Sequence, residues 1–209
     1  MKKDCISLAF VAVFAKPLSV VPVPDSEFCK NLFGNPLDTY HGMGPEGYVI
    51  AVKNKPVPAV VIGPTKIMVK AHNVEDLAKY VKEFSELSAQ KGVSMAYSAY
   101  GTNGEYQWLE LPSSSTEWMW KRFVNPSMEI SPTGSQCTKI SFRFIESAEE
   151  SVNIEVEPRN GVHDGLFVSV NHHHEHGGDA LPCQEELTEM FRRSEELFDN
   201  KYFKKIITD

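Results

Sequence analysis

The sequence has few cysteines, and none of them has the spacing of a metal or disulfide framework. The four cysteines are Cys5, Cys29, Cys137 and Cys183, and no two of them form a Cys-x-x-Cys pair. This spacing excludes a zinc ribbon and a small disulfide-stabilised scaffold. Because free thiols are typical of a reducing compartment, we expect a cytoplasmic protein.

Long apolar runs and an excess of positive charge are also missing. No apolar stretch reaches the roughly 20 residues that a membrane-spanning helix needs. The formal net charge is −7, from 28 acidic and 21 basic residues. Basic residues occur only in small pairs such as Lys121-Arg122 and Arg192-Arg193, and an acidic chain without basic clusters is repelled by phosphate backbones. We therefore expect neither nucleic acid nor a membrane among its partners.

Complete catalytic motifs are absent as well. The chain has no Gly-x-Ser-x-Gly elbow, no Walker A loop and no His-Glu-x-x-His pair. The segment from Gly42 to Val49 does fit Gly-x-Gly-x-x-Gly. A dinucleotide-binding motif follows a strand and opens a helix, whereas this segment precedes a predicted strand. We interpret it as a glycine-rich surface loop.

The N-terminal segment allows two interpretations. Lys2 and Lys3 precede an apolar run over residues 6–15, and Pro17 follows it. A charged start before a short apolar run fits a secretory signal, and a run rich in Val, Phe and Ile fits a buried strand. We favour the strand, and a secretion role for residues 1–16 stays open.

Short β-branched runs separated by Pro, Gly and Asn predict most of the strands. They cover residues 5–15, 48–53, 59–62, 66–70, 139–145, 151–157 and 166–170. A β-hairpin is also predicted, with strands over 93–100 and 105–111 and a turn over 101–104.

Helical periodicity predicts two long helices and one short one. Residues 74–91 form an amphipathic pattern that Asn73 can cap, and residues 184–200 form a second. A short helix is predicted over 117–124, with Ser114 or Ser115 as its cap.

Strands grouped ahead of helices predict an α+β class with antiparallel pairing. We expect a single domain over residues 1–209. It would contain two β-β-β-α units, over 1–92 and 137–209, joined by a hairpin and short helix over 93–136. This pattern suggests a diverged duplication that forms an antiparallel sheet with the helices packed on one face.

The histidines provide the main candidate for chemistry. Four of the seven, His172, His173, His174 and His176, lie within five residues. If the strand continues past residue 170, His172, His174 and His176 share one face, because side chains alternate along a strand. Three imidazoles are enough for a divalent metal such as zinc. The following pair of glycines supports the alternative of a solvated polar loop.

Cys183 is a second candidate, because it precedes a predicted helix. A thiolate is favoured at a helix N-terminus. Cys183 could therefore act as a fourth metal ligand or as a nucleophile, or it could be a small structural residue beside Pro182.

Two functions follow from these observations, and whether the protein is an enzyme stays open. The first is a non-catalytic binding or regulatory module, because no catalytic set is complete. Its partners would be a second copy, contacting through sheet edges or helix faces, another protein, or a small molecule. The alternative is a metal-dependent hydrolase with His172, His174 and His176 as ligands and Glu175 or Asp179 as base. No cofactor other than this divalent metal is expected.

Two stretches of the chain resemble a known family. Ala59 to Glu83 runs strand, Gly-Pro turn, strand, polar loop and helix. Val152 to Phe203 runs strand, turn, a strand ending in Val-Asn, and a helix that closes with Phe-x-x-Ile-Ile-Thr208. This arrangement resembles a sporadically distributed family of uncharacterised prokaryotic proteins. The resemblance implies an α+β fold and assigns no activity and no residue roles. The chain departs from it over residues 113–136 and in the histidine segment.

Overall fold

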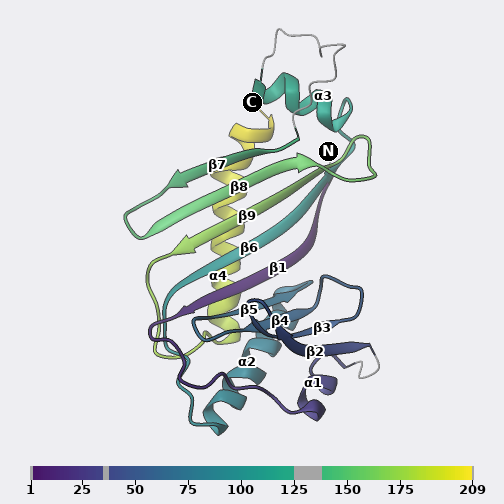
Figure 1. Cartoon of the computed structure of the whole chain (residues 1–209). Helices are drawn as coiled ribbons and strands as arrows, with labels where there is room; N and C mark the ends of the chain where they lie inside the picture. The colour runs from purple at the N-terminus through teal and green to yellow at the C-terminus, as the bar shows by residue number, and fades with distance from the viewer. Residues whose placement is uncertain (1, 35–37, 125–137, 209) are drawn as a thin grey trace. The chain divides into compact units, whose positions relative to one another are not determined.

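The computed structural model describes residues 2–34, 38–124 and 138–208 (Figure 1). The chain forms two compact units. Unit 1 comprises residues 1–6 and 104–171, and unit 2 comprises residues 7–103 and 172–209. The single domain expected over residues 1–209 stays a prediction. Cys137 and residues 125–136 lie outside the described residues.

Within the described residues, nine strands form one antiparallel sheet with the order β2-β3-β4-β5-β1-β6-β9-β8-β7. The strands are β1 Lys2–Phe14, β2 Thr39–Gly44, β3 Gly47–Val52, β4 Ala59–Ile62, β5 Lys66–Ala71, β6 Tyr97–Leu109, β7 Ile140–Ile145, β8 Glu150–Pro158 and β9 Leu166–His174. Strands β1, β6 and β9 contribute residues to both units. The predicted α+β class with an antiparallel sheet is confirmed, and the duplication stays a prediction.

The described residues also include four α-helices, two of which continue as π-helices. They are α1 Ser26–Leu32, α2 Val74–Gln90, α3 Ser115–Met119 continued by η1 Trp120–Val124, and α4 Gln184–Leu197 continued by η2 Phe198–Thr208. The predicted cap of α2 is confirmed, because the Asn73 side chain accepts a hydrogen bond from the Asp76 amide at 2.8 Å. The Ser114 side chain caps α3 in the same way. Helix α1 was not predicted.

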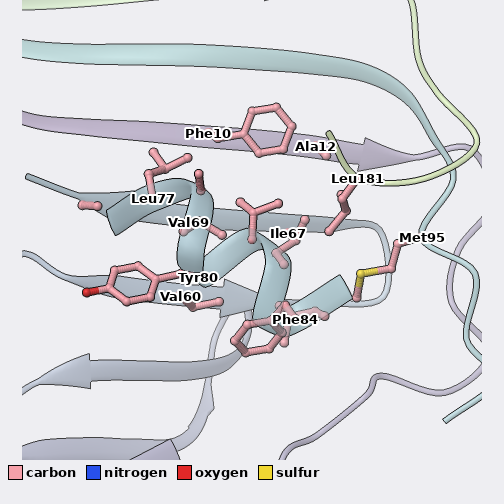
Figure 2. Packing of buried hydrophobic residues seen from close by; sticks show 14 of the residues in the cluster. Phe10, Ala12, Val60, Ile67, Val69, Leu77, Tyr80, Phe84, Met95 and Leu181 are labelled. Carbon is pink, nitrogen blue, oxygen red and sulfur yellow. The ribbon is translucent and has the colours of Figure 1, made fainter. Parts of the chain in front are cut away.

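The core of unit 2 lies between α2 and the strands beside it. Figure 2 shows Leu77 and Phe84 of α2 among apolar side chains of β1, β4 and β5. Leu77, Phe84, Phe10 and Val69 are fully buried. Helix α4 contacts α2 and adds Leu187 to this cluster. Burial of apolar surface contributes about 25 cal/mol per Å², so this packing is what holds the long helices in place.

In unit 1, strands β7 and β8 form an antiparallel hairpin. Their register places Ile140 opposite Val156 and Ile145 opposite Ser151. Helix α3 contacts β8. The Ser115 amide at the start of α3 donates a 2.8 Å hydrogen bond to the carbonyl of His163 in the β8–β9 loop. The N-terminus of this short helix is thus fixed to the hairpin beside it.

The hairpin predicted over residues 93–111 is wrong. Strand β6 runs without a turn from Tyr97 to Leu109, through the Gly-Thr-Asn-Gly segment at 101–104. It lies between β1 and β9, so it pairs along both edges. Pairing on both sides outweighs the local preference of these residues for a turn. Gly104 instead makes room for Tyr106, whose ring atoms would lie 2.5 Å from a Cβ at that position.

The surface loop expected from Gly42 to Val49 is also wrong, because this segment forms the β2–β3 hairpin. Gly42 pairs with Val49, and Gly44 pairs with Gly47. Gly47 has φ +137°, and a Cβ there would lie 2.3 Å from the carbonyl oxygen of Ile62. The chain needs glycine at this position for the close approach of two backbones.

The apolar N-terminal segment forms β1, as the favoured interpretation predicts. Phe10 and Ala12 are fully buried and pair with Val69 and Ile67 of β5. Among the described helices, none combines the length and apolar character needed to cross a membrane.

Candidate metal site

Strand β9 continues through His172 and His174, as the metal-site hypothesis requires, but it ends before His176. Strand β9 ends at His174, and both His172 and His174 are buried, with 1% and 2% of their surfaces exposed. His173 points to the other side of the strand, where its Nε2 atom lies 2.8 Å from Oε1 of Glu175. The alternative of a solvated loop is therefore wrong for His172 and His174.

The two buried imidazoles lie side by side. Their ring centroids are 4.0 Å apart, with an angle of 48° between the ring planes. A ring nitrogen of His172 and one of His174 lie within 4.8 Å of each other. Zinc binds imidazole nitrogen at about 2.0–2.1 Å, so two nitrogens on one ion lie at most about 4.2 Å apart. The 4.8 Å bound on the separation of the two histidine nitrogens is close to this limit.

Two hydroxyl groups hold the ring of His172. Its Nδ1 atom lies 2.7 Å from Oγ of Ser194 on α4. The same Oγ lies 2.5 Å from Oγ1 of Thr102 on β6, and Thr102 is 1% exposed. If Nδ1 of His172 donates this hydrogen bond, the neutral ring carries a lone pair on Nε2, and this lone pair can bind a metal.

An aromatic ring holds His174. Tyr100 on β6 stacks on His174, with ring centroids 4.4 Å apart and an angle of 18° between the planes. Tyr100 also contacts Phe10 and Tyr97, with centroid distances of 6.2 Å in each case. The stack restricts the plane of the His174 imidazole, since an offset ring pair has a preferred geometry.

His176 lies past the end of β9 and is exposed. Its ring meets His174 and Tyr100 edge to face, with centroids 5.2 Å and 5.4 Å away. The structure thus brings His172 and His174 together as neighbouring rings and leaves His176 at the exposed border of the pair. Whether His176 adds a third ligand stays a prediction.

The glycine pair after His176, Gly177 and Gly178, holds the chain beyond β9 against the start of β6. The backbones of Gly178 and Tyr97 exchange two hydrogen bonds, of 2.9 Å and 3.0 Å. A Cβ at Gly177 would lie 1.7 Å from the Tyr97 carbonyl oxygen. Glycine therefore allows the chain to approach the start of β6 directly after the histidines.

Cys183 is the N-cap residue of α4 and is exposed. The Glu186 amide lowers the pKa of the Cys183 thiol, but hydrogen bonding to the Glu185 carboxylate and burial raise it, and the net pKa is above its ordinary value. A helix N-terminus lowers the pKa of a thiol, but the raising effects are larger here. The raised pKa of Cys183 therefore disfavours the expected thiolate.

Three residues around the histidines were not predicted from the sequence: Tyr100, Thr102 and Ser194. Tyr100 and Thr102 lie in the segment that was predicted as a hairpin. Ser194 lies on the helix that was predicted, but its contact with Thr102 joins residues 92 positions apart. Alternation along β6 would have placed Tyr100 and Thr102 on one face, had the strand been predicted as continuous.

Comparison with protein-family models and with curated proteins finds no match for this chain.

Proposed function

We propose that the protein is a metal-binding module in which His172 and His174 hold a divalent transition-metal ion. The observation that carries the proposal is the pair of buried imidazoles on one face of β9, with ring nitrogens within 4.8 Å. Imidazole nitrogen suits zinc, copper and nickel, whereas magnesium and calcium prefer oxygen ligands. Water or a further side chain would complete the coordination of the ion.

A binding role fits the site better than hydrolysis. A catalytic zinc keeps an open position for water and substrate. His172 and His174 are 1% and 2% exposed, which leaves little room for a substrate to reach an ion between them. Glu175, one of the two expected bases, contacts His173 on the opposite side of the strand. These features support the non-catalytic module over the metal-dependent hydrolase.

The proposal predicts which histidines matter for metal content. Tag-free protein, dialysed, loaded with Zn²⁺ and dialysed again, should retain about one zinc per chain. His172→Gln and His174→Gln should each lose most of it. His173→Gln is the matched control, because this ring lies on the other face of β9 and should leave the metal content unchanged.

His176→Gln distinguishes a two-histidine site from the three-histidine site that the sequence suggests. Partial loss of zinc would make His176 a third ligand, and full retention would restrict the site to the buried pair. The proposal fails if the wild-type protein retains no zinc, or if a double variant of His172 and His174 keeps its full content.

A second copy of the chain is the protein partner that the fold supports. Strand β2 is the first strand of the sheet, so one of its edges has no neighbouring strand among the described residues. Tyr40 and Met43 on β2 are 51% and 73% exposed. An unpaired edge is a template for pairing with another strand. Light scattering of the wild type and of Met43→Lys would test this, because a charge on the edge should reduce any dimer.

A further inference from the structure

Three side chains from three distant parts of the chain form a continuous hydrogen-bonded series beside the proposed metal site. They are Thr102 on β6, Ser194 on α4 and His172 on β9. The Thr102 and Ser194 hydroxyl oxygens are 2.5 Å apart, and the Ser194 hydroxyl lies 2.7 Å from Nδ1 of His172. Both end residues, Thr102 and His172, are 1% exposed, so bulk water does not replace these partners.

The position of Ser194 is unusual for a serine in a helix. A helical serine commonly bonds the carbonyl four residues earlier. Ser88 on α2 does so, donating a 2.7 Å hydrogen bond to the Phe84 carbonyl. The Ser194 hydroxyl instead joins two side chains outside its own helix. This difference indicates a role for Ser194 that the stability of α4 alone does not require.

The series allows two arrangements of protons. A hydroxyl has one proton, so Ser194 can donate to only one of its two partners at a time. If Ser194 donates to Thr102, it accepts the N–H of His172 Nδ1, and the Nε2 atom of His172 carries a lone pair. If Ser194 donates to Nδ1, the neutral ring carries its proton on Nε2. Only the first arrangement lets Nε2 coordinate an ion.

We infer that Ser194, supported by Thr102, is a positioning residue that selects the Nδ1–H tautomer of His172 and so sets the affinity of the metal site. This inference rests on the proposed metal-binding function and adds the control of its affinity. The chemical class of the ion is a divalent transition metal with a preference for nitrogen ligands. Because Ser194 lies on α4, the position of this helix and the occupancy of the site are coupled.

A Co²⁺ titration, followed by visible absorption in competition with a chelator, measures the affinity directly. Ser194→Ala should lower the Co²⁺ affinity by about 10- to 100-fold, the usual effect of removing a hydrogen-bond partner of a metal-bound histidine. Thr102→Val removes the second hydroxyl at nearly constant shape and should lower the affinity by less. Thr102→Ser keeps the hydroxyl, so its Co²⁺ affinity should equal that of the wild type.

Ser88→Ala is the matched control, because it removes a buried helical hydroxyl of the same kind away from the histidines. It should leave the Co²⁺ affinity unchanged. A second readout comes from ¹⁵N spectra of the metal-free protein. The Nδ1–H tautomer of His172 should predominate in the wild type, and its population should fall in Ser194→Ala. A purely structural role for Ser194 would not move this population.

The outcomes separate the two proposals. If the wild type binds Co²⁺ and both Ser194→Ala and Thr102→Val bind it equally well, the positioning role is wrong and the metal site stands. If the wild type binds no Co²⁺, both the metal site and the positioning role are wrong. Should Ser194→Ala fail to fold, the comparison of Thr102→Val with Thr102→Ser decides the question alone.

Discussion

The Ser194 hydroxyl on α4 lies 2.7 Å from Nδ1 of His172 on β9. This contact ties a helix of the apolar core to a buried imidazole in the sheet. It explains how a ring placed at the end of a strand can keep a single orientation. The neighbouring His174 is held differently, by the face of Tyr100 at 4.4 Å.

Replacing Tyr100 by leucine should destabilise the protein more than replacing it by phenylalanine. Phenylalanine keeps the ring that stacks on His174, whereas leucine removes it. Aromatic pairs contribute about 0.5–1.5 kcal/mol beyond the area they bury. We therefore expect Tyr100→Leu to lower the free energy of unfolding by about 1 kcal/mol more than Tyr100→Phe does. Urea denaturation of both variants checks this, and equal values would contradict a role for the stack.

Gly177→Ala should lower the stability of the protein much more than Gly34→Ala does. An alanine Cβ at 177 would meet the Tyr97 carbonyl at 1.7 Å, so the paired backbones of Gly178 and Tyr97 would have to separate. Gly34 has φ +69° and open space around it, so alanine there costs only about 1–2 kcal/mol of backbone strain. Thermal denaturation of the two variants compares them. A Gly177→Ala protein as stable as Gly34→Ala would show that the close approach does not exist.

The protein should lose stability in alkaline solution through Tyr48. Burial and the neighbouring Cys29 thiol raise the pKa of Tyr48 to about 12. The unfolded chain ionises tyrosine near pH 10. Between about pH 10 and 12, the folded protein therefore holds a proton that the unfolded chain has lost, so the free energy of unfolding falls as pH rises.

Tyr48→Phe should remove the part of this alkaline loss that comes from Tyr48. The slope of unfolding free energy against pH should be shallower in the variant than in the wild type over this window. Tyr40→Phe should change the slope much less, because Tyr40 is 51% exposed and has the smallest of the effects that raise the pKa of Tyr48. Identical slopes in wild type and Tyr48→Phe would contradict the raised pKa.

Phe84→Ala should be the most destabilising truncation on α2. Phe84 is fully buried against the sheet and meets Phe28 of α1 edge to face at 5.5 Å. Loss of a buried phenylalanine side chain costs about 3–5 kcal/mol. Lys79→Ala, on the exposed side of the same helix, should change stability by less than about 0.5 kcal/mol. Guanidinium unfolding distinguishes the two, and a small effect at Phe84 would contradict the packing in Figure 2.

Local patterns predicted the parts of the fold that depend on neighbouring residues. Helix α2 followed from its apolar period and from Asn73 at its start, both of which act within one or two turns. The shared face of His172 and His174 followed from alternation along a strand, which the backbone imposes wherever the strand continues. These features need no knowledge of the rest of the chain.

Features set by distant residues could not be predicted in this way. The Gly-Thr-Asn-Gly segment has the composition of a turn, yet β6 passes through it because β1 and β9 flank it. The contact of Thr102 with Ser194 joins two elements whose proximity no local pattern records. The sequence therefore predicted the imidazoles of the candidate site. It did not predict the side chains that orient them, which are Tyr100, Thr102 and Ser194.

Long-range ¹H–¹⁵N spectra of the histidine rings, recorded before and after one equivalent of Zn²⁺, test the central claim most directly. The metal site predicts that Nε2 of His172 and one ring nitrogen of His174 move to the shifts of metal-bound imidazole, while the ring of His173 is unchanged. Rings of His172 and His174 that keep their metal-free shifts, with changes only at exposed histidines, would contradict it.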